Sequence, residues 1–536
     1  MASLIAMAGF MGSGKSSVGR EVASRMGYRF VDLDNEFLAQ TGVSIADYFK
    51  NHGEESFRRR ETQLVASVIE QARGADTILA LGGGTLGDPV ARSQVKRGGR
   101  VITLAVEASE AWNRVAGSER PLAVDPMSFK DLHASRRSTY EEAADWLLPV
   151  GSLRVPELSD RICDVLRKTG DDWPRLWGRW LSGTSRSSVI VGGSGALRYL
   201  RAASAEALGE GRSLHLITDS NVLMHWGSQV SSILGGLHSD DMHVIEPGEA
   251  SKDAKTLIGC WEWLAQRNSR RQDIVVALGG GVVGDLAGLV ASTYHRGVQL
   301  WQIPTSLLAQ VDSSVGGKTA INLREGKNLV GTFYQPDLVV IDPATLQTLP
   351  DIDYAGALGE VTKHALLRSE DSLAWLEQNA QAVALRDESV LGELLRWNVF
   401  LKASVVEADE RESGQRAILN LGHTVGHALE NCLGYGALGH GRAVALGLLV
   451  SLAISEQLLG LDESVRRRVR TLFQGWGVDP NLELPSTHAL FDAVAHDKKA
   501  STSSSGFVGL RRPGDPVTGL DVDNQLLTAS LEVIAK

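Results

Sequence analysis

Residues 9–16 form a glycine-rich segment, GFMGSGKS, between an apolar stretch and a segment of helical pattern. The spacing G-x-x-x-x-G-K-S lets backbone N–H groups turn onto phosphate oxygens, and the start of the following helix adds partial positive charge. Lys15 is placed to reach the terminal phosphates, and Ser16 to hold Mg²⁺. The pattern predicts a nucleoside triphosphate site and leaves the phosphate acceptor open.

Polar groups for an acceptor follow two later apolar stretches. Asp32 and Asp34 end YRFVDLD, where alternation with Leu33 directs both carboxylates to one edge of a parallel sheet. Residues 81–84, LGGG, end a further apolar stretch and let the backbone approach a ligand closely. Residues 57–61, FRRRE, either grip an anion or form a solvated helix face.

A second glycine run, GGGVVGD at 279–285, follows the apolar DIVVAL and predicts contact with the phosphates of a dinucleotide. Asp219 and Asn221, at the end of another apolar run, suit ribose hydroxyls. Glu249 and Lys252 follow a third strand end.

Cations gather after this glycine run. Several lie in glycine-bracketed turns (YHRG, VGGKTA, EGKN), which place a charge near a ligand, although for any one of them alone a surface charge is the better interpretation. Together they predict an anionic substrate. The residues are Arg296, Lys318, Lys327 with Asn328, Lys363, Lys402 and Arg416.

Histidines and a glutamate suggest a metal site. His423 and His427 are four residues apart and share a helix face, a pattern found in zinc sites and equally in paired core or surface histidines. His440 and Glu360 are further candidates, so four side chains compete for a site that needs three protein ligands and an open position.

The elements that must position these residues indicate an α/β protein. Strand and helix patterns alternate over 1–165 and again from 188, and long amphipathic runs follow residue 345. The stretch between the two alternating regions has Gly, Pro, Ser and three Trp with no clean period. We expect domains at 1–167, 188–345 and 346–536, with a linker at 168–187 whose tryptophans partly pack on a neighbour.

Composition excludes several classes. The 536 residues are 43% hydrophobic and 22% charged with a net charge of −10, which disfavours sequence-independent nucleic-acid binding. The sequence contains no run of about 18 apolar residues, so it does not predict a membrane span. Three cysteines give no disulfide framework, and the N-terminus does not have the pattern of a signal peptide, so we expect a cytoplasmic protein.

The motifs of residues 1–165, in their order, resemble shikimate kinase: the phosphate loop, DxD, FRRxE, GGG, Arg-Pro-Leu, and an Arg before Tyr-Glu-Glu. The resemblance implies that shikimate is bound by Asp34, Arg58, Gly83 and Arg136, with Asp34 orienting or deprotonating the attacking hydroxyl. It also implies that Asp32 joins Ser16 in placing Mg²⁺. The implied ATP-binding residues are Gly12, Ser13, Gly14, Lys15, Ser16, Ser17 and the lid residue Arg120, of which Lys15 and Arg120 also act in catalysis.

From about 188 to 536 the chain resembles 3-dehydroquinate synthase, through GGGVVGDLAG, IPTSLLAQVDSSVGGKTAIN, GKNLVGTFYQP, GEVTKHALL, ILNLGHTVGHALE and DKK. The resemblance implies a Rossmann-like NAD-binding domain followed by a mostly α-helical metal domain. It implies Glu360, His423 and His440 as ligands of Zn²⁺ or Co²⁺, and it makes His427 an acid/base residue.

The same resemblance assigns the remaining binding residues. Lys318 and Lys363 are implied to act in catalysis, together with His427. Implied NAD contacts are Asp219, Asn221, Glu249, Lys252, Gly280, Gly281, Val282, Asp285, Thr305, Ser306, Lys327 and Thr348. Implied substrate contacts are Arg296, Asp312, Lys318, Asn328, Lys402, Arg416, Asn420 and Lys498 or Lys499.

The implied second reaction converts 3-deoxy-D-arabino-heptulosonate 7-phosphate to 3-dehydroquinate with loss of phosphate, and NAD⁺ is restored in each turnover. The expected partners are therefore the two small substrates, with no nucleic acid and no membrane, and a homodimer through the second half.

The sequence departs from the family patterns at four places. Ser138 stands where proline is usual, next to Arg136, and Ser306 replaces a threonine. Gly359 replaces an alanine beside Glu360, and Arg442 replaces a glutamate two residues after His440. The last change reverses a charge and bears on metal tuning.

Three alternatives remain open. The second half fits less well with a metal-dependent alcohol dehydrogenase, which gives no reason for the cations of VDSSVGGKT and GKN. Phosphorylation of another small polyol is the lesser alternative for the first half. One half could also be retained only as a non-catalytic scaffold for the other. The complete motif sets in both halves of the chain speak against this alternative.

Overall fold

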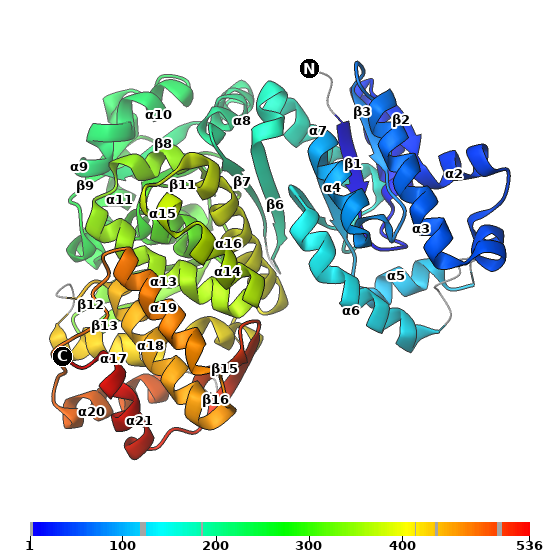
Figure 1. Ribbon diagram of the computed structural model, residues 1–536. Helices are drawn as coiled ribbons and strands as arrows, with labels where there is room; N and C mark the ends of the chain where they lie inside the picture. Colours follow the sequence, from blue (N-terminus) through cyan, green and yellow to red (C-terminus); the bar gives the residue numbers. More distant parts are fainter. Residues whose placement is uncertain (1–3, 118–124, 184–185, 413, 435–437, 501–505) are drawn as a thin grey trace. The chain divides into compact units, whose positions relative to one another are not determined.

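The computed structural model describes residues 4–117, 125–183, 186–412, 414–434, 438–500 and 506–536, without the side chains of 496–500. The chain divides into two compact units, Met1–Leu181 and Ser182–Lys536, which are described separately (Figure 1). Arg120 falls outside the described residues, as does the side chain of Lys498.

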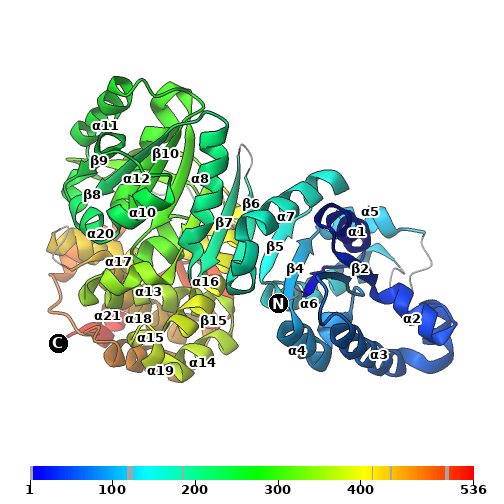
Figure 2. The same ribbon diagram turned by 90° about the horizontal axis from the view of Figure 1, so that it is seen from above.

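The first unit is built on a parallel sheet in the order β2-β3-β1-β4-β5-β6. Helices cover both of its faces (Figure 2). The strands are β1 Leu4–Ala8, β2 Arg29–Asp32, β3 Thr77–Ala80, β4 Arg100–Ala105, β5 Trp146–Pro149 and β6 Leu176–Ser182. The helices are α1 Lys15–Met26, α2 Leu33–Thr41, α3 Ile45–Gln71, α4 Pro89–Gly98, α5 Ala108–Val115, α6 Pro126–Ala143 and α7 Val155–Thr169.

The expected strands and helix at the start of the chain are confirmed. The apolar β1 is buried along its whole length, and α1 ends where Gly27 takes the left-handed conformation that glycine adopts without strain. Since β1, β2 and β3 are parallel, their carboxyl ends meet at one edge and bring the phosphate loop, the aspartates and the LGGG turn together.

Part of the expected linker is regular structure. Residues 170–175 form a 3₁₀-helix, and β6 occupies 176–182. Trp173 is 3% exposed and stacks on Trp146 at 5.0 Å between ring centroids, and Trp180 is 2% exposed. The tryptophans therefore belong to the core of the first unit.

The second unit begins with a parallel sheet in the order β7-β14-β11-β10-β8-β9. The alternation of strand and helix patterns from residue 188 predicts a sheet of this kind, whereas the sequence did not indicate the hairpin β12–β13. The strands are β7 Ser187–Gly193, β8 Leu214–Asp219, β9 Met242–Ile245, β10 Ile274–Gly279, β11 Gln299–Pro304, β12 Lys318–Leu323, β13 Gly326–Phe333 and β14 Leu338–Ile341. The helices of this part are α8 Tyr199–Gly209, α9 Ser220–Val222, α10 Ser228–Ile233, α11 Ala254–Gln266 and α12 Gly281–Thr293.

A helical region follows the sheet, as the amphipathic runs predict, and a pair of antiparallel strands lies in the tail. Its helices are α13 Asp351–Arg368, α14 Glu370–Gln378, α15 Ala380–Ala384, α16 Glu388–Ala408, α17 His423–Leu433, α18 His440–Leu459, α19 Glu463–Gly475, α20 Thr487–Ala500 and α21 Asn524–Leu531, and its strands are β15 Phe507–Arg512 and β16 Asp515–Leu520.

Helix α18 is the centre of this region. Within the described residues it is the one helix long and apolar enough to cross a membrane, but 72% of its most apolar window is buried inside the protein. It packs against α13 and α17, which carry the other metal-ligand candidates. We therefore read it as a core helix.

Candidate active sites

The phosphate loop has the backbone that its glycines predict. Gly9, Gly12 and Gly14 have φ of 140°, 84° and 90°, and a Cβ on Gly12 would lie 2.8 Å from the carbonyl oxygen of Ala111. Lys15 is 8% exposed, and its Nζ donates to the carbonyl oxygens of Gly9 and Phe10 at 2.9 and 3.2 Å. The lysine is thus held at the loop, beside the N-terminus of α1.

The aspartates reach the same edge in a different way from the one expected. Strand β2 ends at Asp32, whose Oδ1 accepts the backbone N–H groups of Asp34 and Asn35 at 3.1 and 3.2 Å and so caps α2. The prediction that Asp32 and Asp34 alternate with Leu33 along a strand is therefore wrong, because Leu33 is already the first residue of helix α2. Asp34 lies in the first turn, and its Oδ1 is 3.3 Å from where a Cβ on Gly82 would be.

Arg58 is held by a residue that sequence reasoning missed. Its Nη1 donates to Glu61 Oε2 at 2.7 Å, and Glu61, 3% exposed, also accepts from the Thr85 hydroxyl at 2.7 Å. Burial raises the pKa of Glu61, while the charge of Arg58 opposes that rise. Glu61 therefore fixes the Arg58 guanidinium beside the LGGG turn.

Arg136 comes from α6 to the same turn. Its Nη1 donates to the Gly83 carbonyl oxygen at 3.0 Å, and the hydroxyl of Tyr140 donates to that oxygen as well. Burial raises the pKa of Tyr140 to about 12, which keeps the phenol a donor at neutral pH. Ser138 is exposed in the middle of α6, so its departure from the family pattern leaves the Arg136 contact in place.

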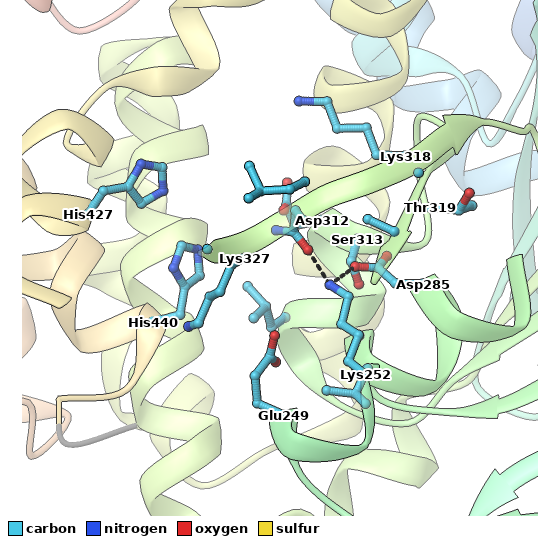
Figure 3. A pocket seen from close by; sticks show the side chains of 18 of the residues that line it. Glu249, Lys252, Asp285, Asp312, Ser313, Lys318, Thr319, Lys327, His427 and His440 are labelled. Atoms are coloured by element: carbon cyan, nitrogen blue, oxygen red, sulfur yellow. Dashed lines mark hydrogen bonds and ion pairs between the residues drawn. The ribbon is translucent and has the colours of Figure 1, made fainter. Parts of the chain in front are cut away.

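The second unit contains a cavity of about 960 Å³ between the sheet edge, the β12–β13 hairpin and α17 (Figure 3). It brings together most of the predicted cations, although they are scattered over the sequence. The predicted residues that line it are Glu249, Lys252, Gly281, Val282, Asp285, Asp312, Lys318, Lys327, Asn328, Lys402, Arg416, His427 and His440.

One side of the cavity is a network around Lys252. Its Nζ donates to Asp285 Oδ2 and to Asn328 Oδ1, both at 2.5 Å, and Figure 3 shows Lys252 reaching towards Asp285. Asn322, which sequence reasoning missed, donates to Glu249 Oε1 at 2.7 Å and accepts the Asn328 backbone N–H at 2.9 Å. Asn322 thereby ties the hairpin to the predicted cofactor residues.

Another part of the cavity lining is a pair of buried cations, Lys402 and Arg416. Lys402 donates to Asp312 Oδ1 at 2.5 Å, and burial lowers its pKa to about 8. Burial alone would raise the pKa of Asp312, but the charge of Lys402 lowers it below the ordinary range. Arg416 is 2% exposed and donates to the Glu410 carbonyl oxygen at 2.8 Å. Lys318 pairs with Glu412 at 2.6 Å.

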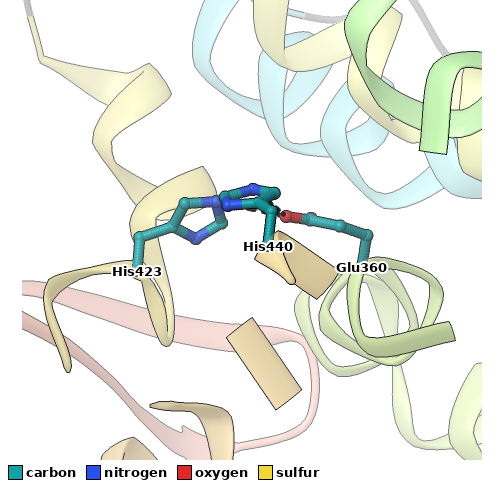
Figure 4. Close-up of side chains that lie close together, drawn as sticks. All are labelled: Glu360, His423 and His440. Carbon is teal, nitrogen blue, oxygen red and sulfur yellow. Dashed lines mark ion pairs between the residues drawn. The ribbon is translucent and has the colours of Figure 1, made fainter. Parts of the chain in front are cut away.

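Glu360, His423 and His440 converge from α13, α17 and α18 (Figure 4). One ligand atom from each lies within 4.8 Å of the others. His423 Nε2 is 3.1 Å and His440 Nε2 3.7 Å from Glu360 Oε1.

The chemistry of this cluster fits a divalent cation. Glu360 is fully buried, and within the described residues neither of its oxygens has a hydrogen bond of good geometry, although Lys363 pairs with Oε2. Burial opposes ionisation of Glu360, but Lys363 and His423 lower its pKa well below the ordinary range. Burial lowers the pKa of His423 to about 4, so its imidazole is neutral and has a lone pair to offer.

His440 and Lys327 share one carboxylate. Glu430 Oε2 lies 3.1 Å from His440 Nδ1, and Glu430 Oε1 accepts from Lys327 Nζ at 3.3 Å. Burial would raise the pKa of Glu430, but the hydrogen bond with His440 lowers it to about 2. His427 lines the cavity next to them, with its ring 5.3 Å from that of His423.

Other predicted residues lie outside the cavity wall. Asp219 caps α9 by accepting the Val222 N–H at 3.0 Å, and Thr348 accepts from Trp226 Nε1 at 2.8 Å. Arg296 is exposed on a turn with a φ of 62° and does not line the cavity. The predicted residues that are described but do not line the cavity are Asp219, Asn221, Gly280, Arg296, Thr305, Ser306, Thr348, Glu360, Lys363, Asn420 and His423.

The two departures near the metal cluster have structural explanations. A Cβ on Gly359 would lie 2.6 Å from the carbonyl oxygen of Gly441, so glycine permits the close approach of α13 and α18. Arg442 turns away from the cluster and pairs with Asp479 at 3.4 Å, while donating to the Asn481 carbonyl oxygen at 3.0 Å.

The two units together define a class of protein. The first is a phosphate-loop phosphotransferase, and the second combines a sheet of the dinucleotide-binding type with a metal cluster on its helices. Family profiles agree: shikimate kinase matches residues 11–167, and the N-terminal and C-terminal parts of 3-dehydroquinate synthase match 242–355 and 357–500. The chain belongs to the 3-dehydroquinate synthase family and carries a shikimate kinase domain ahead of it. It is a bifunctional enzyme of the shikimate pathway, a kinase and a lyase.

Individual relatives support this assignment for the second unit. A 3-dehydroquinate synthase of Pseudomonas putida (strain W619) is 43% identical over 323 residues, which is 60% of this chain and 88% of the relative. A 2-epi-5-epi-valiolone synthase from Streptomyces hygroscopicus, solved with NAD⁺ and Zn²⁺, is 26% identical with a TM-score of 0.59 over 66% of this chain and 98% of that one. A 2-deoxy-scyllo-inosose synthase, solved with carbaglucose-6-phosphate, NAD⁺ and Co²⁺, is 25% identical with a TM-score of 0.58. The match covers 66% of this chain and 99% of that one.

Proposed function

We propose that the first unit binds Mg²⁺-ATP on the phosphate loop and shikimate between Asp34, Arg58, Gly83 and Arg136. The supporting observation is that Arg58 and Arg136 both end at the LGGG turn, beside the loop that carries Lys15. Two arginines suit a carboxylate substrate. Hydroxyl and carboxylate oxygens, here Ser16 and Asp32, are the ligands that Mg²⁺ prefers.

In this proposal Asp34 accepts the proton of the attacking hydroxyl, and Lys15 exchanges its loop carbonyls for terminal phosphate oxygens. Positioning and charge neutralisation provide most of the catalysis in phosphoryl transfer. Arg120 is proposed as a lid residue on the resemblance alone.

For the second unit we propose that Glu360, His423 and His440 hold Zn²⁺ or Co²⁺ and that NAD⁺ lies along the β10–α12 turn. When bound, the metal ion would supply Lewis-acid polarisation of a substrate hydroxyl, and NAD⁺ would supply reversible oxidation at the carbon that carries this hydroxyl. The observation that carries the proposal is a buried carboxylate and two imidazoles converging at the edge of a cation-lined cavity.

The chain's own side chains then bind and orient the anionic substrate. Lys318, Arg416 and Asn328 offer donors for phosphate and carboxylate groups, and buried Lys402 is held ready by Asp312. Lys363 keeps Glu360 ionised, and His427 is proposed to move a proton at the cavity wall.

Parallel assays of the purified chain with each substrate test both proposals. We expect ATP-dependent phosphorylation of shikimate that survives treatment with a zinc chelator and stripping of tightly bound metal, provided that Mg²⁺ is present. Conversion of 3-deoxy-D-arabino-heptulosonate 7-phosphate should stop after stripping and return with Zn²⁺ or Co²⁺. Net NADH accumulation with an alcohol would instead identify a dehydrogenase.

We further propose a cytoplasmic homodimer formed through the second unit, with domains at 1–167, 188–345 and 346–536 joined by residues 168–187. The family resemblance supports the dimer. Sedimentation of the whole chain and of a 182–536 fragment should give twice the monomer mass for both, and a monomeric fragment would contradict this interface.

A further inference from the structure

We propose that Glu430 is a positioning residue that holds the metal ligand His440 and the hairpin cation Lys327 at one carboxylate. The inference rests on the proposed metal site. The sequence motifs assigned no role to Glu430. Glu430 is 5% exposed, lines the cavity and lies on α17, seven residues after His423. It therefore lies on the same helix face as the first histidine ligand.

The first contact fixes the imidazole of His440. Glu430 Oε2 is 3.1 Å from Nδ1, while the other ring nitrogen, Nε2, is 3.7 Å from Glu360 Oε1. A carboxylate on one nitrogen keeps the proton there and leaves the lone pair of the other for a cation. Glu430 thus determines both the tautomer and the direction of a ligand on another helix.

The second contact reaches the hairpin. Glu430 Oε1 accepts from Lys327 Nζ at 3.3 Å, and the two residues are 103 positions apart. Lys327 is on β13 next to Asn328, which joins the network around Lys252. The same carboxylate therefore links the metal cluster to strand β13 and, through Asn328, to the network around Lys252.

This arrangement predicts two separable losses. Glu430→Ala should weaken Zn²⁺ affinity about 10- to 100-fold, the range found for carboxylates behind metal-ligating histidines. It should also raise KM for the phosphorylated substrate, because Lys327 loses its anchor. Glu430→Gln retains an acceptor for His440 and should lose about 3- to 10-fold in Zn²⁺ affinity.

The experiment measures Zn²⁺ affinity of the whole metal-stripped chain by competition with a chromophoric chelator, and then kcat and KM after reloading. Lys327→Met should raise KM and leave Zn²⁺ affinity within twofold of wild type. Glu377→Gln is the matched control, since this carboxylate pairs with Arg468 at 2.7 Å away from the cavity. It should change neither quantity.

Unchanged Zn²⁺ affinity in both Glu430 variants overturns the inference, and if the alanine variant fails to fold, the glutamine variant decides alone. A wild type that binds two Zn²⁺ ions, one of them lost in Glu430→Ala, also overturns it, because His427, Glu430 and His440 would then be direct ligands of a separate ion. If His423→Ala binds Zn²⁺ as tightly as wild type, the proposed metal site itself fails.

Discussion

Buried charged side chains distinguish the lyase cavity from an ordinary protein core. Lys402 is 5% exposed beside Asp312, and Lys363 is 2% exposed beside Glu360. Removing such ions from water costs several kcal/mol each, and pairing offsets that only in part. The arrangement is therefore better explained by binding of an anionic substrate and a metal than by stability.

His364 provides a pH test of this burial. It is fully buried, its Nδ1 lies 2.9 Å from Asn398 Oδ1, and burial, assisted by the charge of Lys363, lowers its pKa to about 4 from 6.5. The unfolded chain binds a proton below pH 6.5, whereas the folded chain does so only near pH 4. This contribution to stability is present above pH 6.5 and is lost as the pH falls towards 4.

His364→Gln should therefore flatten the dependence of unfolding free energy on pH between 6 and 5 by up to about 1.4 kcal/mol per pH unit. Urea unfolding of the metal-stripped chain at pH 7, 6 and 5 measures this slope. His488→Gln, at a side chain 89% exposed, controls for removing a histidine from the surface. Equal slopes for wild type and His364→Gln would contradict the prediction.

Motif spacing predicted the residues that line the two candidate sites better than the residues that hold those side chains in place. The phosphate loop and the cavity cations were predicted from local patterns, since glycine-bracketed turns are short-range signals. Glu61 ends the FRRRE motif and Asn322 ends the VGGKTAIN motif, but neither pattern indicates which residue the side chain holds. Glu61 meets Thr85 across 24 residues and Asn322 meets Glu249 across 73, and only the folded chain brings these pairs together.

At the scale of elements, the contact between α13 and α18 sets the spacing of the metal cluster. Gly359 precedes Glu360, and Gly441 follows His440, so the helices meet beside two of the ligands. The Cβ of an alanine at 359 would lie 2.6 Å from the Gly441 carbonyl oxygen and 3.2 Å from Ala445 Cβ. The family's usual alanine does not fit this spacing.

Gly359→Ala should lower the free energy of unfolding by about 1–3 kcal/mol, as overpacking does, and reduce the zinc retained through dialysis. Thermal unfolding and zinc content measure both effects. Gly392→Ala is the control, because no heavy atom lies within 4 Å of its Cβ on α16 and helix propensity favours alanine by about 0.5–1 kcal/mol. A Gly359→Ala protein as stable as wild type would show that the helices separate without penalty.

Periodicity predicted the parallel strands and the helical region, because buried parallel strands are continuous apolar runs. It missed β12–β13, whose strand β13 alternates little and is largely exposed. It also extended the second strand through Asp34, because a helix cap and a strand end look alike until the Asp32 side chain is seen to accept the N–H groups.

At the scale of the whole molecule, each unit holds a complete set of motif residues within its own residues. Lys15→Ala should abolish shikimate phosphorylation and leave lyase activity largely intact, and His423→Ala should do the reverse. Steady-state assays of both activities on the same preparations measure this. Loss of both activities from either substitution would contradict independent sites.

The two reactions are not consecutive in the pathway, so direct passage of an intermediate between these sites does not follow from fusion. Our hypothesis is that fusion sets equal amounts of the two activities. An isotope-dilution assay should show full exchange of intermediates with the solution, and an undiluted label would contradict the hypothesis.

Helix α18 also determines how the enzyme fails. Its 20 residues begin at His440 and pack against α13 and α17, so we expect heat that removes the metal to loosen the packing around this long apolar helix as well. Once exposed, helix α18 is expected to aggregate with other unfolded chains faster than it refolds. Heat inactivation of the lyase should thus end in turbid, irreversible precipitation, visible as a missing transition in a second calorimetric scan, and added Zn²⁺ should delay it.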